Sequence, residues 1–193
     1  MIIIGVTGGF GTGKTTVSGF FRELGAKVID ADRLVHELYG KDPGMRRALV
    51  RAFGRGVAPN GKISRKRLGE VVFADRSRLK KLTGMVHPRV IKQIKMLAKN
   101  AVSGVLVVDA PLLIESGLTE FVDFILTVKA PGFLIRRRAG QRGFSGEDLR
   151  KRTSAQMPIR KKIALSDFVI NNNRSKKHVK REVKKIWQKV TRG

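Results

Sequence analysis

The feature that most restricts the fold of this chain is a glycine-rich loop placed directly after a short apolar run. Residues 2–6 predict a buried strand, and residues 17–24 carry apolar side chains at helical spacing. Between them, the segment from Gly8 to Thr15 matches the pattern G-x-x-x-x-G-K-[ST]. A strand, a glycine-rich turn and a helix in this order predict an α/β fold that begins with a phosphate-binding loop.

Each position of this pattern has a physical reason. Glycines let the backbone curl so that N–H groups point at phosphate oxygens, and the following helix adds the partial positive charge of its N-terminus. Lys14 supplies a charge for the β- and γ-phosphates, and the Thr15 hydroxyl can ligate Mg²⁺. The alternative is a glycine-rich turn with an ordinary surface lysine; a chance match is roughly a 1-in-50 event. The residues expected to bind the nucleotide here are Gly9, Phe10, Gly11, Thr12, Gly13, Lys14, Thr15 and Thr16. Thr16 is equally well explained as a first-turn helix residue.

Four more short apolar runs predict strands over residues 27–30, 105–109, 124–128 and 168–170. Segments with helical spacing separate them, which indicates parallel strands with right-handed connections. Residues 33–103 are mostly helical in pattern, with a turn at 56–63, and are too long for a simple crossover. We therefore expect a helical insertion there, with Pro88 as the first residue of a helix. The last helix is expected to pack on the sheet rather than on a membrane, through Val179, Val183, Ile186, Trp187 and Val190.

Length and composition favour one globular domain, since the chain has 193 residues of which 41% are apolar. It has no cysteine, which excludes disulfides, thiolate metal sites and thiol nucleophiles. The opening apolar run is too short for a signal peptide or a membrane span, so we expect a cytoplasmic protein with no membrane partner.

The charge of the chain is strongly positive and unevenly distributed. The 41 basic and 15 acidic residues give a net charge of +26. Residues 41–99 carry 17 basic and three acidic side chains, and residues 129–193 carry 20 and four. Such a field attracts polyanions such as nucleotides, nucleic acids or anionic membranes, while a merely solvated basic surface explains the same charge.

Aspartates lie at positions 30 and 32, where the second predicted strand ends. Ligands of open α/β sheets bind beyond the carboxyl ends of the strands, so Asp32 is placed to reach an acceptor hydroxyl. Its carboxylate can accept the hydroxyl proton during attack on the γ-phosphorus, or it can simply cap a helix that begins at Arg33.

Five segments, taken in order, resemble one enzyme family. They are the loop at 7–16, the strand end at 28–32, the step His87-Pro88, the segment Asp-Ala-Pro-Leu-Leu-Ile-Glu at 109–115, and Ala-Gln-Met-Pro at 155–158 followed by 167–170. Together they closely resemble the dephospho-coenzyme A kinases over nearly the whole chain. The loop alone indicates only a large superfamily, whereas the ordered set is specific.

The resemblance implies transfer of phosphate from ATP, with Mg²⁺, to the ribose 3′-hydroxyl of dephospho-coenzyme A, the last step of coenzyme A synthesis. It implies one three-layer P-loop kinase domain over 1–193, with a five-stranded parallel sheet. Within it, 33–103 would be a helical substrate-binding insertion and 136–162 a mobile lid. The implied partner is the small molecule dephospho-coenzyme A; we expect no specific nucleic acid, and a monomer or weak homo-oligomer.

The resemblance also assigns roles to single residues. Asp32 is the candidate base, and Lys14 is a second candidate catalytic residue. Arg137 and Arg142 would close over ATP and stabilise the transferring group. Arg136 and Arg138 are expected at the surface. Asp109 and Thr15 are candidates for holding Mg²⁺, with a strand-end turn residue as the alternative for Asp109, and Asn172 is the candidate for contacting adenine. The residues expected on the acceptor side are Asp32, His87, Leu112, Leu113 and Glu115, with a structural histidine as the alternative for His87.

The chain departs from the family pattern at Asn171, Arg174 and Gly143, which bears on adenine contact and lid closure. One rival hypothesis is another small-molecule P-loop kinase, such as a nucleoside, nucleotide or shikimate-type kinase. The Asp-Ala-Asp end of the second strand and the long insertion after it argue against that. A second rival is a nucleic-acid-binding protein whose loop is a switch or a remnant. Aromatic residues make up only 6% of the chain, which argues against a single-strand binder.

Overall fold

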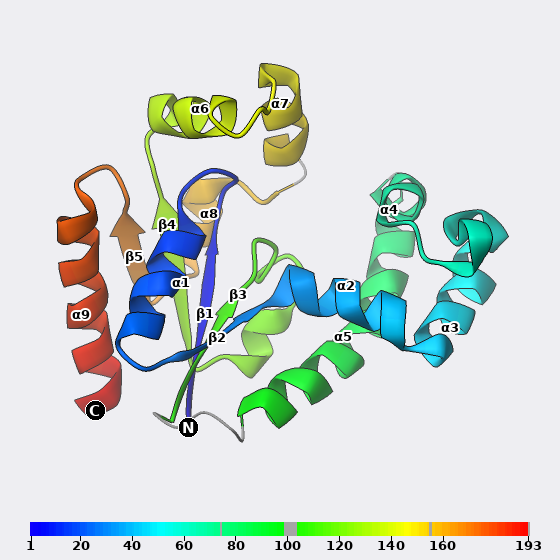
Figure 1. Ribbon diagram of the computed structural model, residues 1–193, viewed down its shortest axis with the longest axis horizontal. Helices are drawn as coiled ribbons and strands as arrows, with labels where there is room; N and C mark the ends of the chain where they lie inside the picture. The colour runs from blue at the N-terminus through cyan, green and yellow to red at the C-terminus, as the bar shows by residue number, and fades with distance from the viewer. Residues whose placement is uncertain (74, 99–103, 155, 193) are drawn as a thin grey trace. The chain divides into compact units, whose positions relative to one another are not determined.

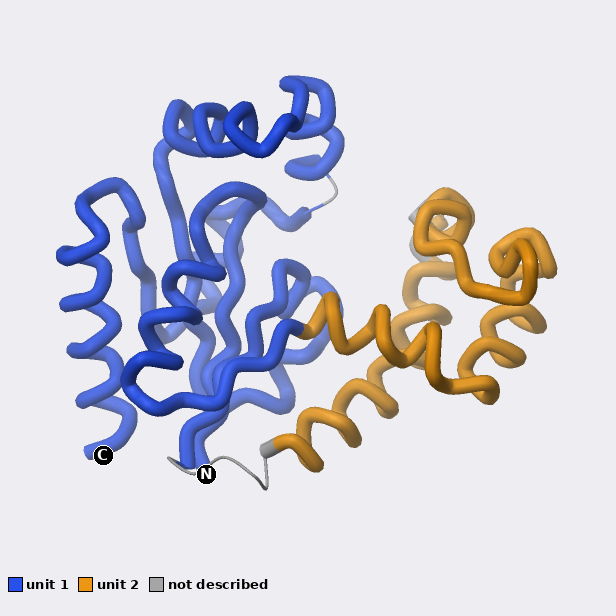
Figure 2. The backbone as a smooth tube through the Cα atoms, viewed as in Figure 1, with its two compact units in different colours: residues 1–30, 98–193 blue, residues 31–97 orange. Residues whose placement is uncertain are grey.

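The computed structural model describes residues 1–73, 75–98, 104–154 and 156–192, and it divides the chain into two compact units (Figures 1 and 2). Unit 1 consists of residues 1–30 and 98–193, and unit 2 of residues 31–97. The strands of unit 1 are β1 (Ile2–Gly8), β2 (Lys27–Asp30), β3 (Val105–Asp109), β4 (Phe124–Lys129) and β5 (Phe168–Asn171). Its helices are α1 (Lys14–Glu23), η3 (Leu118–Phe121), α6 (Gly132–Gly140), α7 (Gly146–Ser154), α8 (Ile159–Ala164) and α9 (Lys176–Arg192).

The five strands form one parallel sheet, as the sequence predicts, and the structure gives their order as β2-β3-β1-β4-β5. Strand β1 is therefore central, between β3 and β4. Because all strands run in one direction, their carboxyl ends share one edge of the sheet. At that edge Asp109 is in register with Val6 on one side and Asp30 on the other. The phosphate loop leaves β1 at the same edge.

Helices cover both faces of the sheet, which gives three layers. Alternate side chains of a strand point to opposite faces, and the face that carries Ile4 and Val6 packs against α1 and α9. The apolar face of α9 belongs to this core through Val179, Val183, Ile186 and Val190, which confirms that the last helix packs on the sheet. On the opposite face, Thr7 and Thr127 hydrogen bond with Lys162 and Ser166, at α8 and just after it.

Unit 2 is helical and takes up the segment between β2 and β3. Its elements are α2 (Ala31–Lys41), α3 (Pro43–Phe53), η1 (Arg55–Val57), η2 (Pro59–Gly61), α4 (Arg65–Phe73) and α5 (Arg76–Ala98). Asp42 caps α3, because its Oδ1 accepts the Met45 N–H at 2.9 Å, and its Oδ2 lies 3.0 Å from Nε of Arg89 on α5. The Met45 hydrogen bond and the Arg89 charge together lower the pKa of the Asp42 carboxyl.

Two sequence predictions about unit 2 are wrong. Pro88 does not begin a helix but lies inside α5, a helix of 23 residues. Proline lacks the N–H that would bond to the carbonyl four residues earlier, and burial of Val86 and Val90 on either side of it keeps this helix in place. The helix after β2 begins at Ala31, so Asp32 lies in its first turn and does not cap a helix starting at Arg33.

The helical insertion at 33–103 and the lid at 136–162 stay predictions. Residues 99–103, at the end of the expected insertion, and residue 155, within the expected lid, lie outside the described residues. In the part of the chain that is described, no helix is both long and apolar enough to cross a bilayer.

Candidate active site

The phosphate loop between β1 and α1 is held in a curled form by its own side chains. Thr12 is buried, and its hydroxyl donates to the Gly9 carbonyl at 2.9 Å. Lys14 folds back over the loop, with Nζ 3.2 Å from the Gly8 oxygen and 3.1 Å from the Gly9 oxygen. The loop ends at Gly13, which caps α1 at φ 93°, a left-handed conformation that favours glycine. The lysine ammonium and the N-terminus of α1 thus lie at one loop, as phosphate binding requires.

Two residues fasten this loop to the rest of unit 1. Asn172, buried after β5, donates through Nδ2 to the Thr12 carbonyl at 2.8 Å. Arg138 of α6 donates to the carbonyls of Thr12, at 3.3 Å, and Asn172, at 3.2 Å. The expectation that Arg138 is a surface residue is therefore wrong, because its guanidinium bridges the loop and the chain after β5. The adenine contact expected of Asn172 stays a prediction, and in this structure its amide nitrogen supports the loop.

Phe10 joins the loop to the segment that carries α6 and α7. Its ring meets that of Phe144 edge to face, with centroids 5.0 Å apart and planes at 86°. The guanidinium carbon of Arg152 on α7 lies 5.1 Å from the Phe10 ring and 4.8 Å from the Phe144 ring. Such ring pairs and cation–π contacts each favour association. The expected lid at 136–162 therefore contacts the phosphate loop in this structure.

The two lid arginines expected to close over ATP both have exposed side chains. Arg137 lies on α6, and Arg142 follows the end of that helix. The turn between α6 and α7 passes through Gly143 at φ 78°, which explains a glycine there. Ser145 and Asp148 then form a capping box at the start of α7, and the Ser145 hydroxyl and N–H lower the pKa of Asp148.

The residues expected to hold Mg²⁺ have suitable chemistry. Asp109 ends β3 beside the loop strand, and its Oδ2 accepts a hydrogen bond from Ser18 of α1 at 3.1 Å. Thr15 follows Lys14 and is exposed at the start of α1. Mg²⁺ prefers oxygen ligands and usually takes only one or two from the protein, completing its shell with water and substrate phosphates. A carboxylate and a hydroxyl at this edge fit that pattern, with Ser18 orienting the carboxylate.

The residues expected on the acceptor side are divided between the units. Asp32, exposed in the first turn of α2, and His87, half-buried within α5, both belong to unit 2. In unit 1, Leu112 is half-buried, while Leu113 is fully buried and a Cβ on Gly5 would lie 2.5 Å from its methyl carbon. This packing makes the Leu113 side chain part of the core, and its substrate contact stays a prediction.

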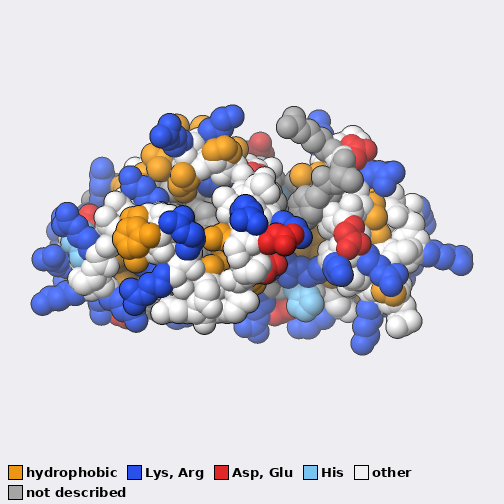
Figure 3. All heavy atoms as spheres, turned by 90° about the horizontal axis from the view of Figure 1, so that it is seen from above, with side chains coloured by type: hydrophobic (Ala, Val, Ile, Leu, Met, Phe, Trp, Pro, Cys, Tyr) orange, Lys and Arg blue, Asp and Glu red, His pale blue; other side chains and the backbone are white. Residues whose placement is uncertain are grey.

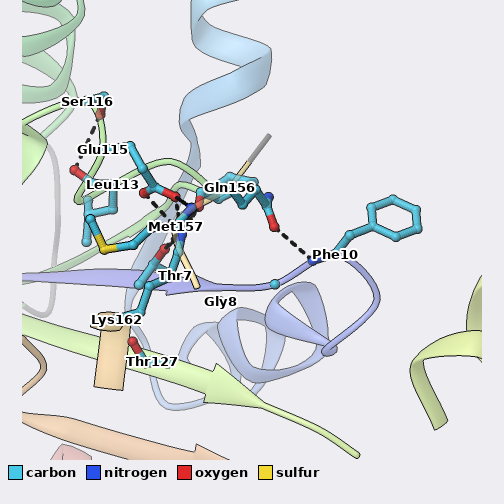
Figure 4. Close-up of polar contacts among 12 residues, drawn as sticks. Thr7, Gly8, Phe10, Leu113, Glu115, Ser116, Thr127, Gln156, Met157 and Lys162 are labelled. Carbon is cyan, nitrogen blue, oxygen red and sulfur yellow. Dashed lines mark hydrogen bonds and ion pairs between the residues drawn. The ribbon is translucent and has the colours of Figure 1, made fainter. Parts of the chain in front are cut away.

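Glu115, the last expected acceptor residue, is engaged within the protein. Its carboxylate oxygens lie 2.8 Å and 3.1 Å from Nζ of Lys162. The same carboxylate accepts the backbone N–H of Met157 at 2.7 Å. Figure 4 shows this group beside the start of the phosphate loop.

Sequence reasoning missed four residues of this site: Ser18, Arg138, Gln156 and Lys162. Each acts through a partner far away in the chain, so its contact is not visible in the local sequence. Gln156 lies within a motif noted above, and its Oε1 accepts the Phe10 N–H at 3.1 Å. Lys162 is flanked by basic residues of similar appearance, and only the fold distinguishes it by burying its side chain completely.

A central strand, a curled loop with a folded-back lysine, and a carboxylate on the neighbouring strand define the class of P-loop phosphotransferases. The model of the dephospho-CoA kinase family matches residues 2–178. The chain belongs to this family, which phosphorylates dephospho-CoA to CoA in the last step of CoA biosynthesis.

Individual relatives agree with this membership. The chain is 40% identical over 191 residues to a dephospho-CoA kinase of Aquifex aeolicus, covering 98% of this chain and 97% of the relative. It is 42% identical over 189 residues to one of Geobacillus kaustophilus, with 94% and 93% covered.

Among solved structures, a Thermus thermophilus protein is 32% identical with a TM-score of 0.84, and 97% of each chain is covered. A dephospho-CoA kinase from Campylobacter jejuni has a TM-score of 0.66 at 27% identity, covering 99% of this chain and 98% of that one. A shikimate kinase of Aquifex aeolicus, at 16% identity and a TM-score of 0.51 with 100% and 99% covered, shares the fold alone.

Proposed function

We propose that this chain transfers the γ-phosphoryl group of MgATP to the ribose 3′-hydroxyl of dephospho-coenzyme A. The observation that carries the proposal is the curled phosphate loop, with Lys14 3.2 Å and 3.1 Å from two of its carbonyls, in a member of this family. When phosphate binds, the ammonium exchanges those carbonyls for phosphate oxygens, and the loop N–H groups take the rest.

Asp32 is proposed to accept the proton of the attacking hydroxyl. It lies two residues beyond the end of β2, in the first turn of α2, and it is exposed to solvent. Because the transition state of phosphoryl transfer is loose, this base contributes less to the rate than positioning does. It acts in the transfer step, so its removal lowers kcat more than it raises either KM.

The remaining roles concern nucleotide and metal. Thr15 and Asp109 would hold Mg²⁺, which when bound neutralises charge on the β- and γ-phosphates. Arg137 and Arg142 would contact the transferring group from the lid, since exposed guanidinium groups on a segment next to the loop are available for phosphate. Asn172 would contact adenine. The acceptor would be bound by Asp32, His87, Leu112 and Leu113, with the helical insertion at 33–103 forming much of its site. Glu115, also expected there from the sequence, is engaged with Lys162 and the Met157 N–H.

A cytoplasmic location and a monomeric or weakly associated state complete the proposal. The location fits a biosynthetic enzyme that uses ATP and a small-molecule acceptor.

An acceptor panel tests the proposed reaction. With MgATP, we expect phosphorylation of dephospho-coenzyme A and none of shikimate, nucleosides or nucleoside monophosphates. A dephospho-coenzyme A analogue with a 3′-deoxyribose should inhibit competitively without being phosphorylated. Phosphorylation of that analogue would contradict the assignment of the 3′-hydroxyl, and a preference for another acceptor would contradict the substrate.

A further inference from the structure

A buried charge lies next to the end of β1, where the phosphate loop begins. The Lys162 side chain on α8 is 0% exposed. Its ammonium donates to the Pro111 carbonyl at 2.6 Å and the Thr7 hydroxyl at 3.3 Å, and it pairs with Glu115 at 2.8 Å (Figure 4). An ammonium has three donors, and these acceptors satisfy them. Thr7 immediately precedes the first glycine of the loop, so the charge is anchored to the strand that leads into it.

The partner carboxylate is anchored to a third segment. Glu115, in the chain after β3, accepts the Met157 N–H at 2.7 Å as well as the lysine. Met157 lies just before α8, so one carboxylate fixes both the start of that helix and its buried lysine. The chain after β3, the end of β1 and the chain before α8 are thereby tied together at one point.

Gln156, the neighbour of Met157, extends this arrangement into the phosphate loop. Its amide oxygen accepts the Phe10 N–H at 3.1 Å, as the dashed line to Phe10 in Figure 4 shows. Phe10 is the third residue of the loop, and its N–H is donated to Gln156, so this hydrogen bond fixes the backbone beside the loop N–H groups that phosphate would use. The loop is thus held on both sides: through Thr7 before its first glycine and through Phe10 after its second.

Stability alone is a weak reason for such a group. An ion pair with a buried member is often no more stabilising than apolar side chains of the same size, because the buried charge must be desolvated. Here the Lys162 side chain is 0% exposed and that of Glu115 20%, and what their hydrogen bonds supply is a fixed geometry. Preorganising a binding loop raises affinity, since less ordering remains to be done when the ligand binds.

We propose that Glu115, Lys162 and Gln156 are positioning residues for nucleotide binding. The ion pair fixes the backbone at Met157, and this backbone holds Gln156 where it fixes the Phe10 N–H. The proposal deepens the proposed function and rests on it only for the kinetic readout. It also gives Glu115 a role toward ATP, in place of direct contact with the acceptor.

The test is a double-mutant cycle read out as the Kd of MgATP, measured by calorimetry without acceptor. We expect Glu115→Gln and Gln156→Ala each to weaken MgATP binding about fivefold to tenfold, a typical range for coupled sites. The combined variant should be little weaker than Gln156→Ala alone, because both changes break the same connection. Additive effects, or an unchanged Kd in either single variant, would overturn the proposal.

Two further variants separate positioning from folding. If Glu115→Gln does not fold, the pair Glu115→Leu with Lys162→Met removes both charges together, and it should fold and show the same weakened Kd. Val183→Ala, in the core on the other face of the sheet, should lower the Tm and leave the Kd unchanged. A weakened Kd in Val183→Ala would show that any loss of stability has this effect and would overturn the proposal.

Kinetics with dephospho-coenzyme A distinguish this idea from the proposed reaction. We expect Glu115→Gln to raise KM for ATP and to leave KM for dephospho-coenzyme A within about twofold. A rise confined to KM for the acceptor would overturn the positioning role and restore Glu115 as a substrate residue. Because the Kd of MgATP needs no acceptor, the cycle gives its answer even if the chain phosphorylates a different one.

Discussion

Single side chains decide how the phosphate loop is supported, and several of them are polar groups with partners far away in the chain. Asn172 and Arg138 hold the Thr12 carbonyl from one side, at 2.8 Å and 3.3 Å. Gln156 holds the Phe10 N–H from the other, at 3.1 Å. A loop built from glycines has little stiffness of its own, so these contacts supply the order that its sequence cannot.

Replacing Arg138 tests this support at the scale of one residue. We expect Arg138→Ala to raise KM for ATP about tenfold, which corresponds to about 1.4 kcal/mol, in line with the loss of charge-assisted hydrogen bonds. Steady-state kinetics with varied ATP measure it. Arg136→Ala is the matched control, because Arg136 lies on the same helix with an exposed side chain, and its KM should stay within about twofold of the unaltered chain. Equal KM values for the two variants would contradict the role given to Arg138.

Helices of unit 2 depend on caps and cross-helix contacts that are local enough to measure. Asp42 both caps α3 and pairs with Arg89 of α5, 3.0 Å away. We expect Asp42→Ala to lower the free energy of unfolding by about 1 kcal/mol at pH 7. Asp42→Asn should cost less, because asparagine caps equally well and only the partly exposed ion pair is lost. Urea unfolding followed by circular dichroism gives both values, and a larger loss in Asp42→Asn would contradict this order.

The same contact has a defined pH dependence. The pKa of Asp42 is lower in the folded chain than in the unfolded one, where a value of about 3.9 is usual. Its contribution is therefore fully present above about pH 4 and is lost as the pH falls through the lower folded pKa. The stability difference between the unaltered chain and Asp42→Asn should shrink between about pH 4 and about pH 2. A difference that grows over this range would contradict the direction of the pKa shift.

At the scale of elements, the sequence predicts most of unit 1 and less of unit 2. All five strands contain short apolar runs bounded by loops, so their pattern alone locates them, and the parallel direction follows from the helices between them. The sequence predicts a helix start at Pro88 because proline is favoured there, but the tertiary packing of its buried neighbours outweighs that local preference. The phosphate loop was predictable because one contiguous pattern contains it. Lys162 and Arg138 were not, because among 41 basic residues only the fold decides which are buried or bridging.

The charge of the whole molecule exceeds what the site uses. Lys and Arg side chains are spread widely over the face shown in Figure 3, with few acidic ones between them. In unit 1, the exposed side of α9 carries Lys177, Arg181 and Lys184 beside its buried apolar face. A surface with this charge attracts any polyanion weakly, and salt screens the attraction.

Neutralising part of this surface tests whether its charge affects RNA binding without affecting the kinase reaction. We expect the triple change Lys177→Gln, Arg181→Gln and Lys184→Gln to weaken binding of an arbitrary RNA oligonucleotide several-fold at about 50 mM salt. Binding to the unaltered chain should itself fall steeply by about 200 mM salt. Fluorescence anisotropy measures both, and kcat/KM for the kinase reaction should be unchanged. Tight binding to one RNA sequence that persists at about 200 mM salt would instead indicate a specific nucleic-acid function.

If this chain makes coenzyme A with Lys14 in its phosphate loop and Asp32 as the base, both side chains are needed for the reaction. Coenzyme A formation from MgATP and dephospho-coenzyme A can be followed for the unaltered chain, Lys14→Ala and Asp32→Asn. We expect formation by the unaltered chain and losses of about 10²-fold or more in both variants, mainly in kcat for Asp32→Asn. Phosphate transfer or hydrolysis that never yields coenzyme A, or full activity in either variant, would contradict this expectation.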